Sequence, residues 1–298
     1  MSKKVLSIIT YNILADYLKN EGYIFSKKEY LNNNYRINLL IKKIKKEINR
    51  NKNSIFCFQE VGPDQYAYLH ILFSNNEYNS VIFRDNAIFY PSSYKVTFVE
   101  TQTIRKLSDK YLKDKPKLIK QTHNFNHSYI ILTLKSKYFK EITVCCTHLI
   151  SNPKHENIKI LQCYLLAKHL ESFKRVIFCG DFNSMPYSKQ YELLSIGKTK
   201  YPYYKELKTK LKITSAYKKF YGEEINITTH TSNMKTPVFT ETIDYIWITK
   251  EFIPINTTDV ITRADIIKKQ EKYKKDTLPN KKEPSDHYML RVDLQLKN

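Results

Sequence analysis

The sequence predicts an α/β fold with a substantial buried sheet. Short apolar runs, typical of buried strands, are interspersed along the chain with stretches whose apolar residues recur at helical spacing. No linker, repeat or change of composition divides the 298 residues. Hydrophobic residues make up 42% of the chain, which is enough material for a packed core. We therefore expect residues 1–298 to form one domain.

The expected strands are apolar runs that are too short for a helix and are bounded by polar or turn residues. They lie at residues 5–14 and 54–59, within 78–99, and at 127–135, 141–148, 175–180, 243–249 and 288–296.

The expected helices show helical spacing of apolar residues or a recognisable end. Asn32 and the two asparagines after it can cap a helix over residues 36–48. Pro63 suits the first turn of a helix that runs to about residue 74. An amphipathic helix is expected at 156–172, and a short helix near 187–195 ends before a glycine. The Lys-rich stretch 105–124 has poor periodicity and is expected to be a loop.

The chain is strongly basic, with 50 Lys and Arg against 29 Asp and Glu and a net charge of +21 at pH 7. Such an excess is typical of proteins with a polyanionic partner. The same excess also arises by drift in an AT-rich genome, because Lys, Asn, Ile and Tyr dominate here. No apolar stretch reaches the roughly 18 residues of a membrane-spanning helix, so we expect no membrane partner. The glycine-rich phosphate loops of nucleotide-driven motors are absent.

The five cysteines do not form a disulfide or zinc framework. Their number is odd, no C-x-x-C pair occurs, and most lie in apolar runs typical of buried thiols. This usage favours a reducing compartment. Polar residues from Thr10 to Asn12 interrupt the first apolar run and Asp16 follows it, which favours a strand over a signal peptide. We therefore expect a cytoplasmic protein.

Polar side chains of catalytic types stand at the ends of the apolar strands. They are Asn12, Glu60, His148, Asp181, Asn183, Asp244, Asp286 and His287. A single acid after a strand is usually a turn residue or a helix cap. Six such strand ends are harder to explain in that way, because rigid strand ends can direct polar groups into one cleft.

Such a set supports one kind of chemistry. Carboxylates with amide oxygens make a hard oxygen site, which suits Mg²⁺ or Mn²⁺ and not zinc. Two histidines can donate hydrogen bonds to a phosphate, and an acid can orient a water molecule and take its proton. Together these groups would hydrolyse a phosphodiester by metal-assisted in-line attack.

Seven motifs give the chain a family resemblance. In order, they are TYNILAD, FCFQEV, NAIFY, CTHL, CGDFNSMP, TIDYIW and LPNKKEPSDH. From about residue 5 to residue 296 the chain resembles the endonuclease/exonuclease/phosphatase superfamily. Within it, the chain resembles the deadenylase branch, which includes nocturnin, Angel and the nuclease of the CCR–NOT complex. The resemblance implies a DNase I-like four-layer αββα sandwich, with two packed mixed sheets flanked by helices, as a single catalytic domain over residues 1–298.

The resemblance also implies the metal site. Glu60 would be the main ligand of Mg²⁺, and Asn12 and Asp286 would lie close to the metal.

The remaining catalytic roles are implied in the same way. Asp181 would activate or orient the attacking water, and Asn183 would hold that water and the phosphate. His148 and His287 would stabilise charge on the scissile phosphate. Asp244 would hydrogen-bond His287 and fix its tautomer.

A base-binding clamp is a further implication. Deadenylases place a proline and a phenylalanine on the two faces of a substrate adenine, at spacings that Pro153 and Phe239 match. Asn233 is a candidate for contacts to the edge of the base. The alternatives stay open: Pro153 is also an ordinary turn residue before a helix, and Phe239 an ordinary core aromatic.

The first functional hypothesis is therefore a Mg²⁺-dependent 3′-to-5′ exoribonuclease that removes adenylates from RNA tails and releases 5′-AMP. One departure favours an Angel-like RNA 3′-end phosphatase that acts on 2′,3′-cyclic phosphates, because Ile150 and Ser151 replace the aromatic that many deadenylases carry after the histidine. A 2′,5′-oligoadenylate or small-molecule phosphodiesterase is a third reading. These enzymes share their metal residues, so the motifs do not separate them.

Other classes fit less well. A catalytically dead RNA-binding module predicts the loss of at least one catalytic residue, and none is lost. Missing hydrophobic anchors disfavour a membrane sphingomyelinase. The motifs GDFNSMP and LPNKKEPSDH resemble those of the RNA branch, which disfavours an abasic-site DNA endonuclease. No leucine-rich repeats precede the domain, so we expect no docking of that kind on a CCR–NOT scaffold. The lysine runs at 42–46 and 268–275 could hold RNA, but such runs are more often solvated surface.

Overall fold

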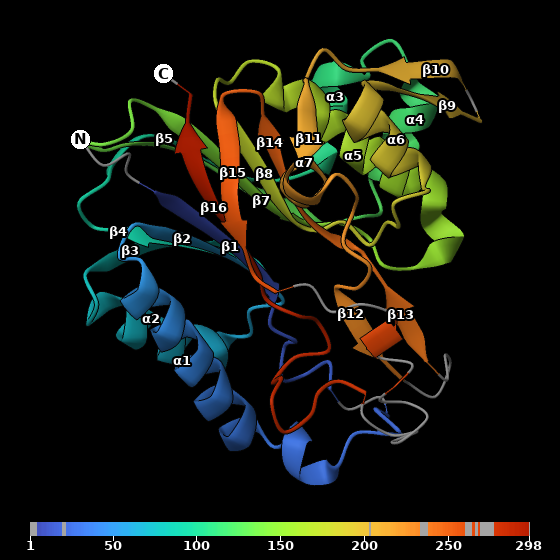
Figure 1. Ribbon diagram of the computed structural model, residues 1–298. Helices are drawn as coiled ribbons and strands as arrows, with labels where there is room; N and C mark the ends of the chain where they lie inside the picture. Colours follow the sequence, from blue (N-terminus) through green and yellow to red (C-terminus); the bar gives the residue numbers. More distant parts are fainter. Residues whose placement is uncertain are drawn as a thin grey trace.

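The computed structural model describes residues 5–19, 22–202, 204–232, 238–259, 264–265, 268 and 277–297. In these residues two six-stranded mixed sheets pack against each other, and helices cover their outer faces (Figure 1). The predicted four-layer αββα sandwich is confirmed.

The first sheet contains both the first and the last strand of the chain. Its spatial order is β15 (Phe252–Thr257), β16 (Leu290–Leu296), β1 (Leu6–Asn12), β2 (Ser54–Gln59), β4 (Asn86–Pro91) and β3 (Tyr78–Phe83). Strands β1 and β2 are parallel, and the other neighbours are antiparallel. Helices α1 (Asn33–Arg50) and α2 (Pro63–Ser74) cover its outer face, and the short 3₁₀ helix η1 (Lys28–Leu31) precedes α1.

The second sheet is built around another parallel pair. Its spatial order is β11 (Ile213–Ser215), β14 (Asp244–Thr249), β8 (Val176–Asp181), β7 (Ile142–His148), β6 (Ser128–Lys135) and β5 (Lys95–Thr103). Strands β7 and β8 are parallel. The outer face is covered by α3 (Arg105–Tyr111), α4 (Pro116–Thr122), α5 (Glu156–Leu170) and α6 (Lys189–Ile196). Helix α7 (Ala216–Tyr221) packs beside the edge strands β11 and β15.

Smaller elements connect these layers. Two ribbons lie outside the main sheets: β9 (Lys198–Tyr201) with β10 (Tyr204–Lys208), and β12 (Thr229–Thr231) with β13 (Phe239–Glu241). A 3₁₀ turn, η2 (Pro153–His155), leads into α5.

The central strands are buried on both faces. In β2, Ile55 and Cys57 point into the core between the two sheets, whereas Phe56 and Phe58 pack under α1 and α2. Both kinds of position are apolar because each faces a packed layer. This is why the strand sequences form continuous apolar runs rather than alternating patterns, and why the eight strand predictions are confirmed.

Two predictions about helices are wrong. The stretch 105–124 is not a loop, because α3 and α4 bury Leu107, Leu112 and Leu118 against α5 while most of their lysines stay exposed. Helix α5 is not amphipathic, since α3, α4 and α6 cover the side that faces away from the sheet. The short elements β9–β13, α7 and β15 were not predicted, and each is too short for a clear period.

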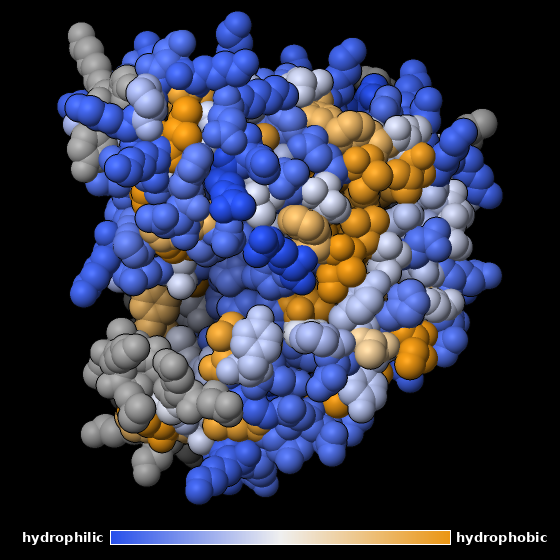
Figure 2. Space-filling view, turned by 180° about the vertical axis from the view of Figure 1, so that it is seen from behind, coloured by the Kyte–Doolittle hydropathy of each residue, from blue (hydrophilic) through white to orange (hydrophobic). Residues whose placement is uncertain are grey.

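The surface is mostly hydrophilic, with an apolar band across the face seen in Figure 2. Large apolar side chains that are exposed include Ile71 on α2 and the neighbours Phe98 and Val99 on the edge strand β5. Of the helices in the described ranges, none has the length and apolarity to cross a membrane.

At Gly180 the backbone of β7 leaves no room for a side chain on β8. This residue has φ +144°, and a Cβ atom at its position would lie 1.9 Å from the carbonyl oxygen of Thr147. The next pair in register is His148 opposite Asp181. Only glycine fits this position without moving the backbone that carries these two side chains.

We expect Gly180→Ala to reduce the free energy of unfolding by about 3 kcal/mol or more, because strain and a backbone clash add. The matched control is Gly222→Ala at the end of α7, where φ is +86° but no atom lies within 4 Å of the added Cβ. The Gly222→Ala variant should lose only about 1–2 kcal/mol of its free energy of unfolding. Urea unfolding of both variants measures the difference, and equal losses would contradict the close approach of the two strands.

Candidate active site

The predicted catalytic side chains meet at one end of the sandwich. Asn12, His148 and Asp181 are the last residues of β1, β7 and β8, and Glu60 follows β2 directly. Asp244 opens β14 opposite Asp181. In a parallel pair the carboxyl ends of both strands lie at the same edge of the sheet. The two parallel pairs, one in each sheet, therefore bring these residues together.

Asn12 links the two sheets through its carboxamide. Its Nδ2 donates to Glu60 Oε1 at 2.8 Å in its own sheet and to Asp181 Oδ2 at 3.1 Å in the opposite sheet. Its Oδ1 accepts the backbone N–H of Leu14 at 3.0 Å. Leu14 and Glu60 both have positive φ, which turns the chain sharply where the strands end. In this orientation Asn12 connects the two carboxylates directly.

Asp181 lies between the two predicted histidines. Its Oδ2 is 3.5 Å from His148 Nε2 and 3.7 Å from His287 Nε2. Its Oδ1 accepts the backbone N–H of Asn183 at 2.8 Å. The carboxylate is almost completely buried, so these contacts fix its orientation.

Each histidine also pairs with a second acid through its other ring nitrogen. His287 Nδ1 lies 2.8 Å from Asp244 Oδ2, which bears out the predicted pairing, and His148 Nδ1 lies 3.3 Å from Asp85 Oδ2. Although burial lowers the pKa of His148, the charges of Asp85, Asp181 and Glu60 outweigh it and raise that pKa to about 10. Burial also lowers the pKa of His287, but the neighbouring carboxylates of Asp244 and Asp181 outweigh it and raise that pKa. The Nε2 atoms of both rings are directed at Asp181.

The segment that carries Asp286 and His287 is held from several sides. Ser285 Oγ donates to the carbonyl oxygen of Asn12 at 2.6 Å, and the Tyr23 hydroxyl donates to Asp286 Oδ2 at 3.1 Å. The hydroxyl of Thr229 donates to the carbonyl of Asp286 at 2.7 Å. The contact of Ser285 thus ties the segment before the last strand to the end of the first strand.

Arg36 on α1 supports the same region from beneath. The side chain is buried and donates to the carbonyl of Pro284 at 2.7 Å, to that of Ile13 at 2.9 Å and to Asp16 Oδ1 at 2.7 Å. One guanidinium therefore ties the loop after β1 to the segment before β16.

The donor set fits a divalent cation. Burial and the negative charge of Asp286 raise the pKa of Glu60, so a bound cation would stabilise the ionised form. Ligand atoms of Asp181, Asp244 and His287 also lie within 4.8 Å of one another. This second set differs from the predicted ligands Glu60, Asn12 and Asp286. In it, however, Asp244 Oδ2 and His287 Nδ1 already share a hydrogen bond, which leaves fewer atoms for a metal.

The side chain of Asn183 is engaged by its neighbours. Its Nδ2 donates to the carbonyl of Leu149 at 2.9 Å, and Lys159 Nζ donates to its backbone carbonyl at 2.6 Å. Asn183 has φ +49°, so the chain turns directly after β8. These contacts hold the carboxamide close to Asp181.

The predicted base clamp is only partly described. Pro153 is exposed at the start of η2, five residues after His148, and Phe239 is half-buried at the start of β13. Asn233 lies outside the described residues. The stacking role of Pro153 and Phe239 stays a prediction.

Sequence reasoning missed Asp85, Tyr23 and Lys159. Asp85 lies in the hairpin turn between β3 and β4, directly before the NAIFY motif, and there an acid is typical of a turn. Tyr23 lies in an aperiodic loop. The available signal for Asp85 was its position next to a family motif.

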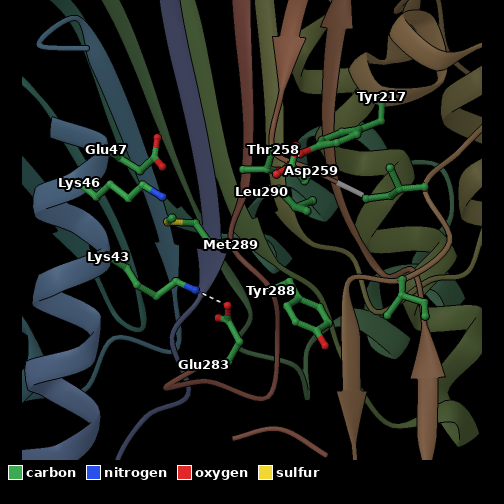
Figure 3. Close-up of a pocket in the computed structure, with 12 residues that line it drawn as sticks. Lys43, Lys46, Glu47, Tyr217, Thr258, Asp259, Glu283, Tyr288, Met289 and Leu290 are labelled. Atoms are coloured by element: carbon green, nitrogen blue, oxygen red, sulfur yellow. Dashed lines mark hydrogen bonds and ion pairs between the residues drawn. The ribbon is translucent and has the colours of Figure 1, made fainter. Parts of the chain in front are cut away.

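A nearby cavity of about 290 Å³ is separate from this site. It lies between α1 and the segment Glu283–Leu290, and Lys43 crosses it to form an ion pair with Glu283 (Figure 3). None of the predicted catalytic residues lines it.

Comparison with known proteins places the chain in a family. Residues 9–287 match the Endonuclease/Exonuclease/phosphatase family. The chain is 27% identical to the "CCR4-Not complex 3′-5′-exoribonuclease subunit Ccr4" of Candida albicans, over 98% of the chain and 41% of that protein. It is 26% identical to "2′,5′-phosphodiesterase 12" of Mus musculus, over 97% of the chain and 51% of that protein. The chain thus spans about two fifths to one half of the length of these relatives.

A solved structure shares the fold. It is described as ANGEL2, a 2′,3′-cyclic phosphatase, in complex with adenosine-2′,3′-vanadate. Its TM-score is 0.80 at 21% identity, and the match covers 100% of this chain and 97% of that one. These matches agree with the predicted deadenylase branch.

Enzymes of the family generally depend on a divalent metal, and the acidic and histidine cluster is consistent with this. With its match extending over most of the sequence, the protein is a member of the Endonuclease/Exonuclease/phosphatase family of phosphoester hydrolases.

Proposed function

We propose that the protein is a Mg²⁺-dependent 3′-to-5′ exoribonuclease that removes adenylates from RNA and releases 5′-AMP. The observation that carries this proposal is the convergence of Glu60 and Asp181 on Asn12, with a histidine on each side of Asp181. Acids and histidine side chains thus surround one point, as the hydrolysis of a phosphodiester requires.

Glu60 would hold the metal, with Asp286 close by. Oxygen ligands of this kind suit Mg²⁺, and Mn²⁺ can replace it. When bound, the metal supplies Lewis-acid stabilisation of charge on the phosphate. Asn12 would keep Glu60 and Asp181 at a fixed separation, which its two hydrogen bonds support.

Asp181 would orient the attacking water and accept its proton, and the Asn183 carboxamide would hold that water and the phosphate. His148 and His287 would donate hydrogen bonds from Nε2 to phosphate oxygens. Asp244 and Asp85 would keep these rings protonated and correctly rotated, because each accepts from Nδ1.

RNA as the substrate is supported by the named activity of the Candida albicans relative. A preference for adenine would come from Pro153 and Phe239 on the faces of the base and from Asn233 at its edge. A cytoplasmic location fits the five cysteines, all of which are free and buried.

An Angel-like 2′,3′-cyclic phosphatase is the second candidate. The observation that favours it is the Ile150-Ser151 pair after His148, in place of the aromatic of many deadenylases. Hydrolysis of 2′,5′-oligoadenylates or small phosphoesters uses the same metal residues and is the third.

The test is incubation of the purified protein with 5′-labelled RNA ending in about twenty adenosines, which is long enough to show a ladder. We expect shortening of the tail and release of 5′-AMP with Mg²⁺ and none with EDTA, with weak activity on a uridine tail. Loss of only a terminal cyclic phosphate from a matched RNA would instead establish the Angel-like activity.

Glu60→Gln should reduce this turnover by about 10³-fold, because the main metal ligand loses its charge, while RNA binding stays largely intact. The matched control is Glu223→Gln, which makes the same change at an exposed position after α7 and should leave turnover unchanged. Wild-type turnover in Glu60→Gln would refute the metal assignment.

Asp85→Asn should reduce turnover by about 10–100-fold and change its pH dependence. Asp85 raises the pKa of His148, and His148 donates only when protonated, so activity is lost as pH rises through that pKa. Removal of the Asp85 charge lowers this pKa, and the alkaline decline should therefore begin at a lower pH. Asp114→Asn, at an exposed position, is the control. An alkaline decline that does not move would show that Asp85 does not act through His148.

A further inference from the structure

We propose that the end of the sandwich opposite the active site binds the phosphodiester backbone of RNA. This inference rests on the proposed RNA substrate, and it adds a binding surface that none of the catalytic motifs contains.

The first part of this surface is a cavity of about 610 Å³ beside β5, β6, β7 and β8. Its basic lining side chains are Lys95, Lys135, Lys137, Lys140 and Arg175. One acidic side chain, Glu141, lines it as well. The four lysines are exposed, so their ammonium groups are available to an anion from solvent.

The second part is a cavity of about 460 Å³ between α6, β11 and the end of β14. Lys210, Lys212, Lys219 and Lys250 line it, and its described lining includes no acidic side chain. The Lys219 amine donates to the carbonyl of Phe252 at 2.7 Å. We call the basic side chains of the two cavities together the basic end.

The strand register fixes the position of the basic end. In the parallel pair, Thr143 lies opposite Val176 where the strands start, and His148 lies opposite Asp181 where they finish. Lys140 and Arg175 come just before these two strands, so they lie at the starting end. Strand β7 has 7 residues, which at about 3.3 Å each separates the two ends by roughly 20 Å.

The charge distribution explains why such a surface is needed. Glu60, Asp85, Asp181, Asp244 and Asp286 gather at the catalytic end, where they repel a polyanion. The Debye length at physiological salt is about 8 Å, so cations roughly 20 Å away do not neutralise this cleft through solvent. They can instead hold the part of the RNA that lies outside the cleft, through contacts that carry no sequence information.

The same geometry sets a length requirement. A stacked strand advances about 3.4 Å per nucleotide, so about six stacked nucleotides join the catalytic end to the basic end. A stacked tetranucleotide in the active site is too short to reach the lysines. The basic end should therefore act on long RNA and not on short oligoadenylates.

The test is the triple variant Lys135→Gln, Lys137→Gln, Lys140→Gln. The control is Lys113→Gln, Lys117→Gln, Lys120→Gln, which removes the same charge from exposed lysines on and before α4 that line neither cavity. Binding of a labelled RNA of about 30 nucleotides is measured by fluorescence anisotropy in EDTA, over a series of salt concentrations.

We expect the test variant to bind RNA about tenfold or more weakly. Each lost phosphate contact lowers the slope of log K against log salt concentration by about 0.7, so the loss of three lysines should lower it by about 2. The control should change little. Turnover of a tetraadenylate should be equal in both variants and in the wild type.

Equal losses in the two triple variants would overturn the proposal, because only net charge would then matter. Unchanged RNA binding in the test variant would overturn it too. Binding to phosphatidylserine vesicles is measured in parallel, and a test variant that loses vesicle binding but keeps RNA binding would also overturn the proposal. If the protein binds RNA through these lysines but hydrolyses none, the proposed function fails and the surface stands. If the protein hydrolyses RNA and the test variant binds RNA normally, the proposed function stands and the binding surface fails.

Discussion

The active site depends on one carboxamide that joins the two sheets. Asn12 donates to Glu60 beside it and to Asp181 across the sandwich, and so connects the two carboxylates directly. This geometry requires that the strands of both parallel pairs end at the same level. Gly180 contributes to it, because its missing side chain lets β7 and β8 approach one residue before His148 and Asp181.

Electrostatics divides the molecule into two ends. At the catalytic end, carboxylates raise the pKa of His148, and burial with Asp286 raises that of Glu60. Such a cluster is costly unless a cation and a phosphate complete it. Among the described residues, nine basic side chains line the two cavities at the starting end of β7 and β8. The net charge of +21 thus coexists with an acidic active site.

The sequence was most informative where the chain is most buried. Strands such as β2 and β8 are apolar on both faces, so they were recognised without any alternation, and the polar residues at their ends pointed to the site. Helix α5 was misjudged for the same physical reason, since other helices cover its outer side. Asp85 was missed because its partner, His148, lies 63 positions away and only the fold brings the two together. Short-range patterns do not encode such contacts.

The position of the metal is the central claim that remains to be measured. Crystals grown with Mn²⁺ in place of Mg²⁺ would show the ion directly through its anomalous scattering. We expect a peak at the carboxylate of Glu60, close to Asp286, with the Asp244–His287 hydrogen bond intact. A peak confined to Asp181, Asp244 and His287, with no ion at Glu60, would contradict this metal position.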